Sequence, residues 1–196
     1  MPNPVDPEGR KPRKPPRPVT PAVLDRMALA YLERYASSAG NLQRVLARKV
    51  ERRCRLREED PGPFLPLVEE AVARAVSSGL VNDAGYAQAR VASLRRRGGS
   101  TRAIAAKLAA KGVDRETAAD ALARDDETRA ADDPDADPEL EAARALAKRR
   151  RIGPFRVGAR AENRDRDLAR LARAGFPYAV ARAVVDAGRE PDVGDD

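Results

Sequence analysis

The sequence contains no histidine and no tryptophan, and its single cysteine is Cys54. Without histidine, the chain lacks the side chain that serves most often as a general base near neutral pH. One cysteine excludes an internal disulfide and any zinc site made from several cysteines. A glycine-rich phosphate loop with its lysine and a nucleophile elbow are missing as well. We therefore expect a protein that is not an enzyme and that holds no metal and no cofactor.

Long apolar runs are also missing. The N-terminus is rich in proline and charged residues and does not resemble the apolar stretch of a secretory signal peptide. No window combines the length and the apolarity of a membrane-spanning helix. These features predict a soluble, cytoplasmic protein, which we expect to be a monomer.

Aromatic residues make up only 4% of the 196 residues, whereas 42% are hydrophobic and 35% are charged. A core must therefore be built from Ala, Leu and Val, whose small side chains allow helices to approach closely. Apolar residues recur at helical spacing, and no stretch alternates with the period of a strand. The predicted fold class is all-α.

The chain is basic, with a formal net charge of +7 at pH 7 and a pI near 10.0. A bias toward arginine and alanine explains part of this charge, but the charge is also segregated in blocks. Residues 90–124 hold nine basic and three acidic residues, residues 125–141 hold one and nine, and residues 144–173 hold eleven and three. This blocking favours an anionic partner, with nucleic acid first.

Proline, glycine and capping residues divide the chain into about nine helices. Thr20-Pro21 is a typical helix start, and Gly79, Gly112 and Gly153 are placed as helix ends. From these signals we predict a disordered basic tail at 1–18, three-helix repeats at 19–80, 81–124 and 138–188, an acidic linker at 125–137 and a disordered tail at 189–196.

The second and third repeats match at a fixed offset of 63 residues, at which Leu108, Gly112 and Leu122 correspond to Leu171, Gly175 and Val185. The shared pattern is a helix, a glycine, an apolar residue and a new helix start. The first repeat matches less well, since Val50 stands where the glycine is expected. One three-helix repeat buries too little surface to be stable alone, so we expect the repeats to stack into an elongated, curved array.

Two basic clusters, Arg95–Arg97 and Lys148–Arg151, are expected at the C-terminal ends of the first helices of their repeats. Basic side chains stabilise a helix C-terminus, which is a purely structural explanation for them. Alternatively, stacked repeats align the clusters into a basic stripe for a phosphate backbone or an acidic protein groove. The candidate contact residues are Arg95, Arg96, Arg97, Arg102, Lys107, Lys111, Lys148, Arg149, Arg150 and Arg151.

The segment Gly79-Leu80-Val81-Asn82-Asp83-Ala84-Gly85-Tyr86-Ala87 resembles the signature of the RecX family, and Ile104 to Val113 and Ala174-Gly175-Phe176 resemble its later motifs. RecX proteins are small all-helical modulators of the RecA recombinase. The resemblance implies a protein that binds RecA and its filament on single- or double-stranded DNA and inhibits ATP hydrolysis, strand exchange and filament growth. It would thereby modulate recombinational DNA repair and the SOS response.

The chain departs from the family pattern in places: Ala174 replaces an arginine, and the first repeat carries a proline-rich insertion. We interpret the signature as structural, with a helix cap and core positions. Its residues are Gly79, Leu80, Asn82, Asp83, Tyr86, Ala87, Gly112 and Gly175.

Two other functions fit the sequence. Short helices joined by glycine turns are compatible with a helix-turn-helix regulator that binds specific duplex DNA. A helical-repeat scaffold for an acidic protein is the other alternative.

Overall fold

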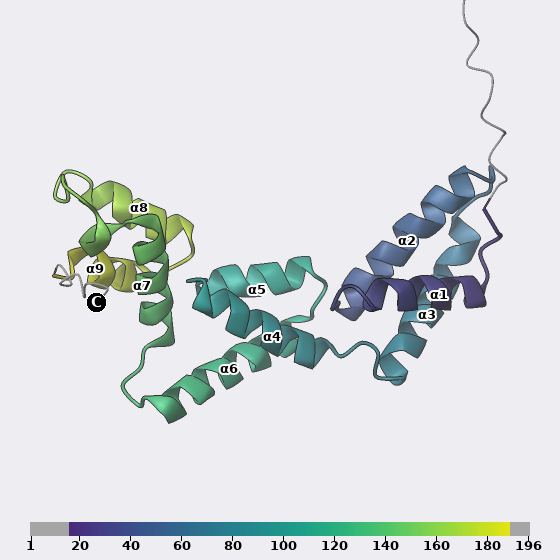
Figure 1. The fold of residues 1–196 in the computed structure, drawn as a ribbon, viewed down its shortest axis with the longest axis horizontal. Helices are drawn as coiled ribbons and strands as arrows, with labels where there is room; N and C mark the ends of the chain where they lie inside the picture. The colour runs from purple at the N-terminus through teal and green to yellow at the C-terminus, as the bar shows by residue number, and fades with distance from the viewer. Residues whose placement is uncertain (1–15, 189–196) are drawn as a thin grey trace, which may run out of the picture. The chain divides into compact units, whose positions relative to one another are not determined.

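The structure is a computed structural model that describes residues 16–188 (Figure 1). The predicted tails, apart from residues 16–18, lie outside the described residues. The described part of the chain is helical and contains no strand, which confirms the all-α class. The α-helices are α1 (Pro21–Leu32), α2 (Ala39–Arg55), α3 (Leu65–Ser77), α4 (Asp83–Arg96), α5 (Thr101–Ala110), α6 (Arg115–Asp132), α7 (Pro138–Arg150), α8 (Arg164–Arg173) and α9 (Tyr178–Asp186). Short 3-10 helices are η1 (Gly62–Phe64) and η2 (Gly153–Phe155).

The helices form two compact units. The first unit comprises residues 16–36 and 41–80, and it contains the first repeat apart from residues 37–40. The second unit comprises Ser37–Gly40 and residues 81–188, and it contains the second and third repeats.

In the first unit, α1 packs on α3, and α2 contributes a regular apolar stripe. Leu42, Leu46, Val50 and Cys54 follow one another every four residues along α2 and are fully buried. Burial raises the pKa of the Cys54 thiol, and the negative charges of Glu59 and Asp60 act in the same direction. The cysteine is therefore a core residue that stays protonated near neutral pH.

The start of α1 is the one that the sequence predicts. The Thr20 hydroxyl accepts a hydrogen bond from the Val23 amide, and Pro21 is the first helical residue. The helix ends at Leu32, and the side chain of Tyr35, which follows it, is 57% exposed. Its ring lies 5.2 Å from that of Tyr31, so it packs on the helix surface instead of in the core.

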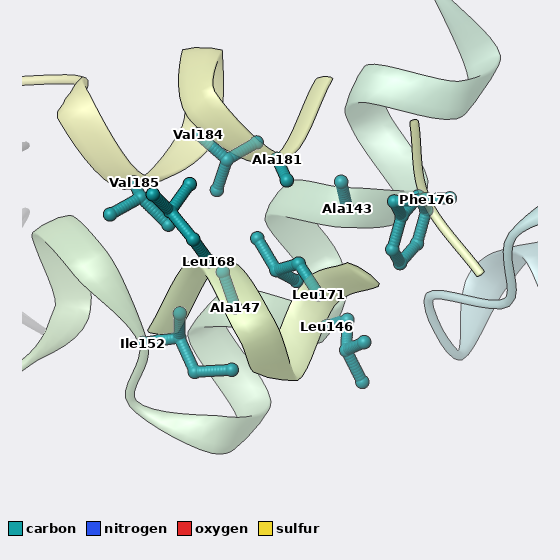
Figure 2. Close-up of a cluster of buried hydrophobic side chains, with 11 residues drawn as sticks. Ala143, Leu146, Ala147, Ile152, Leu168, Leu171, Phe176, Ala181, Val184 and Val185 are labelled. Atoms are coloured by element: carbon teal, nitrogen blue, oxygen red, sulfur yellow. The ribbon is translucent and has the colours of Figure 1, made fainter. Parts of the chain in front are cut away.

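Each repeat of the second unit has its own core. In the second repeat, α4 packs along α6 and contacts α5 around Val91, Ile104 and Leu108. In the third repeat, side chains from α7, α8 and α9 face one another (Figure 2). The fully buried residues of this third core include Ala143, Ala147, Leu171, Ala181 and Val184, small or branched as the composition predicts.

The acidic segment that we predicted as a linker from Asp125 is helical as far as Asp132, because α6 continues through it. Asp125 accepts a hydrogen bond from Arg129 one turn later, and Arg129 also pairs with Glu141 at the start of α7. These ion pairs, together with contacts to Arg95 described below, neutralise acidic side chains that would otherwise repel one another. Only the short connection after Asp132 links the two helices.

Candidate nucleic-acid interface

The turns at Gly112 and Gly175 have the same geometry. Gly112 follows α5 and Gly175 follows α8, with φ angles of 76° and 96°. The amide of the next residue donates back to the last buried leucine of the helix, from Val113 to the Leu108 carbonyl and from Phe176 to the Leu171 carbonyl. This left-handed turn favours glycine and explains the fixed offset in the sequence.

Each of these turns is contacted by a serine from an earlier segment of the second unit. The Ser100 hydroxyl donates to the Ala174 carbonyl at 2.7 Å, and the Ser38 hydroxyl donates to the Lys111 carbonyl. Both serines are fully buried. A Cβ atom on Gly175 would stand 2.6 Å from the Ser100 oxygen, so the glycine is needed for this close approach as well as for its backbone conformation.

In addition to the two serines, two carboxylates make hydrogen bonds to backbone amides. Each carboxylate lies in the first turn of the first helix of its repeat. Asp83 accepts a hydrogen bond from the Ala39 amide at 2.8 Å, and Glu139 accepts one from the Thr101 amide at 3.0 Å. In each case the amide belongs to the first residue of a helix, where backbone donors have no partner in the helix itself. Asp83 of the signature thus bonds the Ala39 amide within the second unit.

The remaining signature residues also have local structural contacts, with one exception. Asn82 caps α4 by accepting from the Gly85 amide at 2.9 Å. Ala87 is fully buried, and Tyr86 packs half-buried against the core of the second repeat. Gly79 has a φ of 74° after α3. Leu80, in contrast, is 52% exposed.

Arg95 lies inside the second unit, with only 3% of its surface exposed. Its guanidinium donates to Glu139 at 2.6 Å and to the Thr101 hydroxyl at 2.7 Å, and it is paired with Asp126 at 3.3 Å and with Asp125 at 3.9 Å. Burial raises the pKa of Asp126, while Arg95 opposes that shift. The side chain is committed to joining α4, α6 and α7, so we leave Arg95 out of the proposed binding surface.

The other nine candidate residues are all exposed, and none makes an ion pair within residues 16–188. They lie at the end of α4, along α5 and its turn, and at the end of α7. They are Arg96, Arg97, Arg102, Lys107, Lys111, Lys148, Arg149, Arg150 and Arg151.

The ends of α4 and α7 are equivalent in backbone conformation. Gly98 follows the first basic cluster and Arg151 is the last residue of the second, and both have a positive φ, 74° and 52° respectively. The amides of Gly99 and Ile152 donate back to the carbonyls of Leu94 and Ala147 in the same way. The two clusters therefore occupy matching positions in the second and third repeats.

Asp167 on α8 is a buried carboxylate that the sequence does not reveal. Its side chain is completely inaccessible, accepts two hydrogen bonds from Arg156 and accepts a third from the Gly153 amide at 3.0 Å. Burial alone would raise the pKa of Asp167, but the Arg156 and Gly153 hydrogen bonds outweigh it and the pKa is lowered. An aspartate among the charged residues that begin α8 carries no sequence signal of burial.

Two negative observations concern the described residues. Within residues 16–188, no group of three or more acidic or cysteine side chains is placed to hold a metal ion. No helix in the same range is both long and apolar enough to span a membrane.

The chain is similar in sequence to known proteins over the helices just described. Residues 82–122 match the model of the second three-helix domain of RecX. The Regulatory protein RecX of Myxococcus xanthus (strain DK1622) is 46% identical over 184 residues, which cover 92% of this chain and 94% of that protein. The chain belongs to the RecX family. The Regulatory protein RecX of Agrobacterium fabrum (strain C58 / ATCC 33970) is 32% identical over 151 residues, covering 73% of this chain and 76% of that protein. No solved structure gives a significant match.

Membership in the RecX family extends the resemblance noted in the signature to nearly the whole chain. The matched second domain contains the Asn82 cap, the Gly112 turn and Arg95 itself, whereas the carboxylates that pair with Arg95 lie after it in the sequence. RecX relatives are named as regulatory proteins, which agrees with the expectation of a regulator.

Proposed function

We propose that this protein is a non-enzymatic regulator that binds the RecA recombinase on DNA and inhibits its ATPase, strand exchange and filament growth. Such inhibition would modulate recombinational repair and the SOS response. The observation that carries the proposal is the 46% identity to a regulatory protein RecX over 92% of the chain.

The surface of the second unit supports a polyanionic partner. The nine exposed basic residues of the candidate set have no carboxylate partner within residues 16–188, whereas Arg95, Arg156 and Arg164 are each paired with a carboxylate. A basic side chain without an internal partner loses no ion pair when it binds phosphate. The exposed clusters are therefore available for binding.

The decisive measurement is the rate of ATP hydrolysis by RecA on single-stranded DNA, with this protein added below the RecA concentration. We expect a lower rate and shorter filaments. Unchanged ATPase, strand exchange and filament length would refute the proposal. Selection from random duplex DNA that yields a specific sequence motif would instead support a helix-turn-helix regulator.

A charge-matched pair of variants tests the basic clusters. The double variant Arg96→Ala, Arg97→Ala removes two unpaired exposed charges and is expected to weaken inhibition and binding to the filament. The control Arg129→Ala, Arg164→Ala removes two charges that already pair with Glu141 and Asp186. Equal inhibition by both variants would exclude Arg96 and Arg97 from the interface.

A further inference from the structure

The third repeat has an open pocket of about 470 Å³ between the C-terminal ends of α7 and α8. Three arginines line it, Arg150 from α7 and Arg170 and Arg173 from α8. Its other lining residues are apolar: Leu146, Ile152 and Ala174. The volume lies within the range of roughly 300–1,000 Å³ that is usual for small-ligand sites.

The three guanidinium groups are largely free of internal partners. Arg150 and Arg173 make no ion pair within residues 16–188. Arg170 lies 3.6 Å from Asp167, but both oxygens of that carboxylate already accept hydrogen bonds, from Arg156 and from the Gly153 amide. Three positive charges thus converge on one pocket with little neutralisation, which favours an anionic ligand.

The second repeat serves as an internal comparison. At the 63-residue offset, Arg173 corresponds to Ala110, and by the matching ends of α4 and α7, Ile152 corresponds to Gly99. By the same offset, Lys107 and Lys111 stand in place of Arg170 and Ala174. The second repeat therefore keeps one of the three arginines and has basic or glycine residues in place of two of the apolar ones. Basic residues stabilise helix C-termini in both repeats. That stabilisation therefore does not explain why arginines and apolar residues line a pocket in the third repeat.

The chemistry of the pocket combines phosphate recognition with an aliphatic surface. Arginine binds phosphate through parallel N–H donors and can also stack on the face of a base. The apolar floor consists of Ala174, which is partly exposed, and of Leu146 and Ile152, which are almost fully buried and present little surface to a ligand. A base can lie on such a floor only when it is free of its partner strand and neighbours, because the bases of a duplex are paired and stacked.

We propose that this pocket, which we call the arginine pocket (Leu146, Arg150, Ile152, Arg170, Arg173 and Ala174), binds one nucleotide of single-stranded DNA. The arginines hold the phosphate, and the base lies against the apolar floor. The proposal deepens the proposed function, since it assigns a DNA site and a strand preference to the third repeat. Its test does not use RecA. The nucleotide site can therefore be refuted while inhibition of RecA stands, and inhibition of RecA can be refuted while the nucleotide site stands.

The experiment measures binding of the full chain to a fluorescein-labelled single-stranded oligonucleotide by fluorescence anisotropy over a range of salt concentrations. The variants Arg150→Ala and Arg173→Ala are compared with Arg144→Ala. Arg144 is exposed, lies on α7, does not line the pocket and is not one of the nine candidate contact residues. Circular dichroism verifies that each variant is folded.

We expect the double variant Arg150→Ala, Arg173→Ala to bind about tenfold more weakly and the salt dependence to fall by about 0.7 per lost phosphate contact. Arg144→Ala should change affinity by about twofold or less. Losses no larger than that of Arg144→Ala, or no measurable binding of single strands by the parent protein, would overturn the proposal.

A second variant tests the floor without changing charge. Ala174→Leu places additional side-chain atoms in the pocket and is expected to weaken binding of the single strand while leaving binding of a duplex of equal length unchanged. Deoxyadenosine monophosphate should compete weakly with the oligonucleotide, and inorganic phosphate at the same concentration should compete less. Equal effects on single strand and duplex would show a non-specific polyanion surface and refute the assignment.

Discussion

Arg95 and Glu139 are joined across the boundary between the second and third repeats, with Nη1 of the arginine 2.6 Å from Oε2 of the glutamate. The same carboxylate accepts hydrogen bonds from the Thr101 amide and hydroxyl. One residue at the start of α7 thereby ties together the end of α4 and the start of α5. This buried junction makes Arg95 a structural residue within a surface cluster of arginines.

Replacement of Arg95 should therefore lower the stability of the fold and should not directly remove a contact to RecA or DNA. Arg95→Met leaves Glu139, Asp125 and Asp126 without their shared cation, and we expect a loss of about 3–5 kcal/mol in the free energy of unfolding. Arg96→Ala, one residue away on an exposed position, should change it by about 0.5 kcal/mol or less. Urea denaturation measures both. Equal stabilities for the two variants would contradict the buried junction.

Gly98 allows α4 to approach α7 closely. A Cβ atom there would lie 2.5 Å from the Leu146 amide nitrogen and 2.8 Å from the Ala142 carbonyl oxygen. Gly158 has nearly the same φ, 72° against 74°, but has open space around it. We expect Gly98→Ala to cost about 3 kcal/mol or more and Gly158→Ala only about 1 kcal/mol, the cost of the left-handed conformation. Thermal or urea unfolding of both variants gives the comparison, and a difference near zero would argue against the close approach.

Arg151 occupies the left-handed position that Gly98 occupies in the preceding repeat, with φ 52° and ψ 56°. Arg151→Gly removes the steric cost of this conformation and should stabilise the second unit by about 0.5–1 kcal/mol. Arg149→Gly, within the helix, should destabilise it by about 1 kcal/mol because glycine disfavours helix. The midpoint of urea unfolding should shift in opposite directions for the two variants; a shift in the same direction would contradict this explanation.

Asp167 gives the third repeat a defined sensitivity to acid. Because its pKa is lowered in the folded state, the ionised carboxylate stabilises the fold above its ordinary pKa of about 3.9. This contribution is lost as the pH falls below about 4 toward the folded-state pKa. Asp167→Asn should cost about 3 kcal/mol at pH 7, since it breaks a buried ion pair, and the difference from the parent should shrink below pH 4.

The matched control for this pH dependence is Asp165→Asn on the same helix. The Asp165 side chain is 96% exposed, so its replacement should change stability by about 0.5 kcal/mol or less at either pH. Denaturant unfolding at several pH values measures both variants. A constant difference between parent and Asp167→Asn from pH 7 to pH 3 would show that the carboxylate is not stabilised in the folded state.

The candidate interface was only partly predictable from the sequence. The arginine triplet at Arg95–Arg97 reads as a single cluster, and nothing in the sequence separates its first member from the other two. The structure separates them because Arg95 faces α6 and α7, while Arg96 and Arg97 are exposed. Likewise, Asp125 and Asp126 are indistinguishable by composition from the acidic residues that follow them.

By itself, the sequence determined the all-α class, most helix boundaries and the repeat, because these depend on short-range properties. The Asn82 and Asp137 caps, the Pro21 start and the glycines at 112 and 175 each act within about one helical turn. The tertiary structure alone decided which charges are buried and which arginines converge on a pocket. Arg95 pairs with Glu139, which lies 44 positions later in the sequence, and Arg150 and Arg173 line one pocket between α7 and α8. Such contacts depend on how helices pack across repeats, and local sequence patterns do not encode that packing.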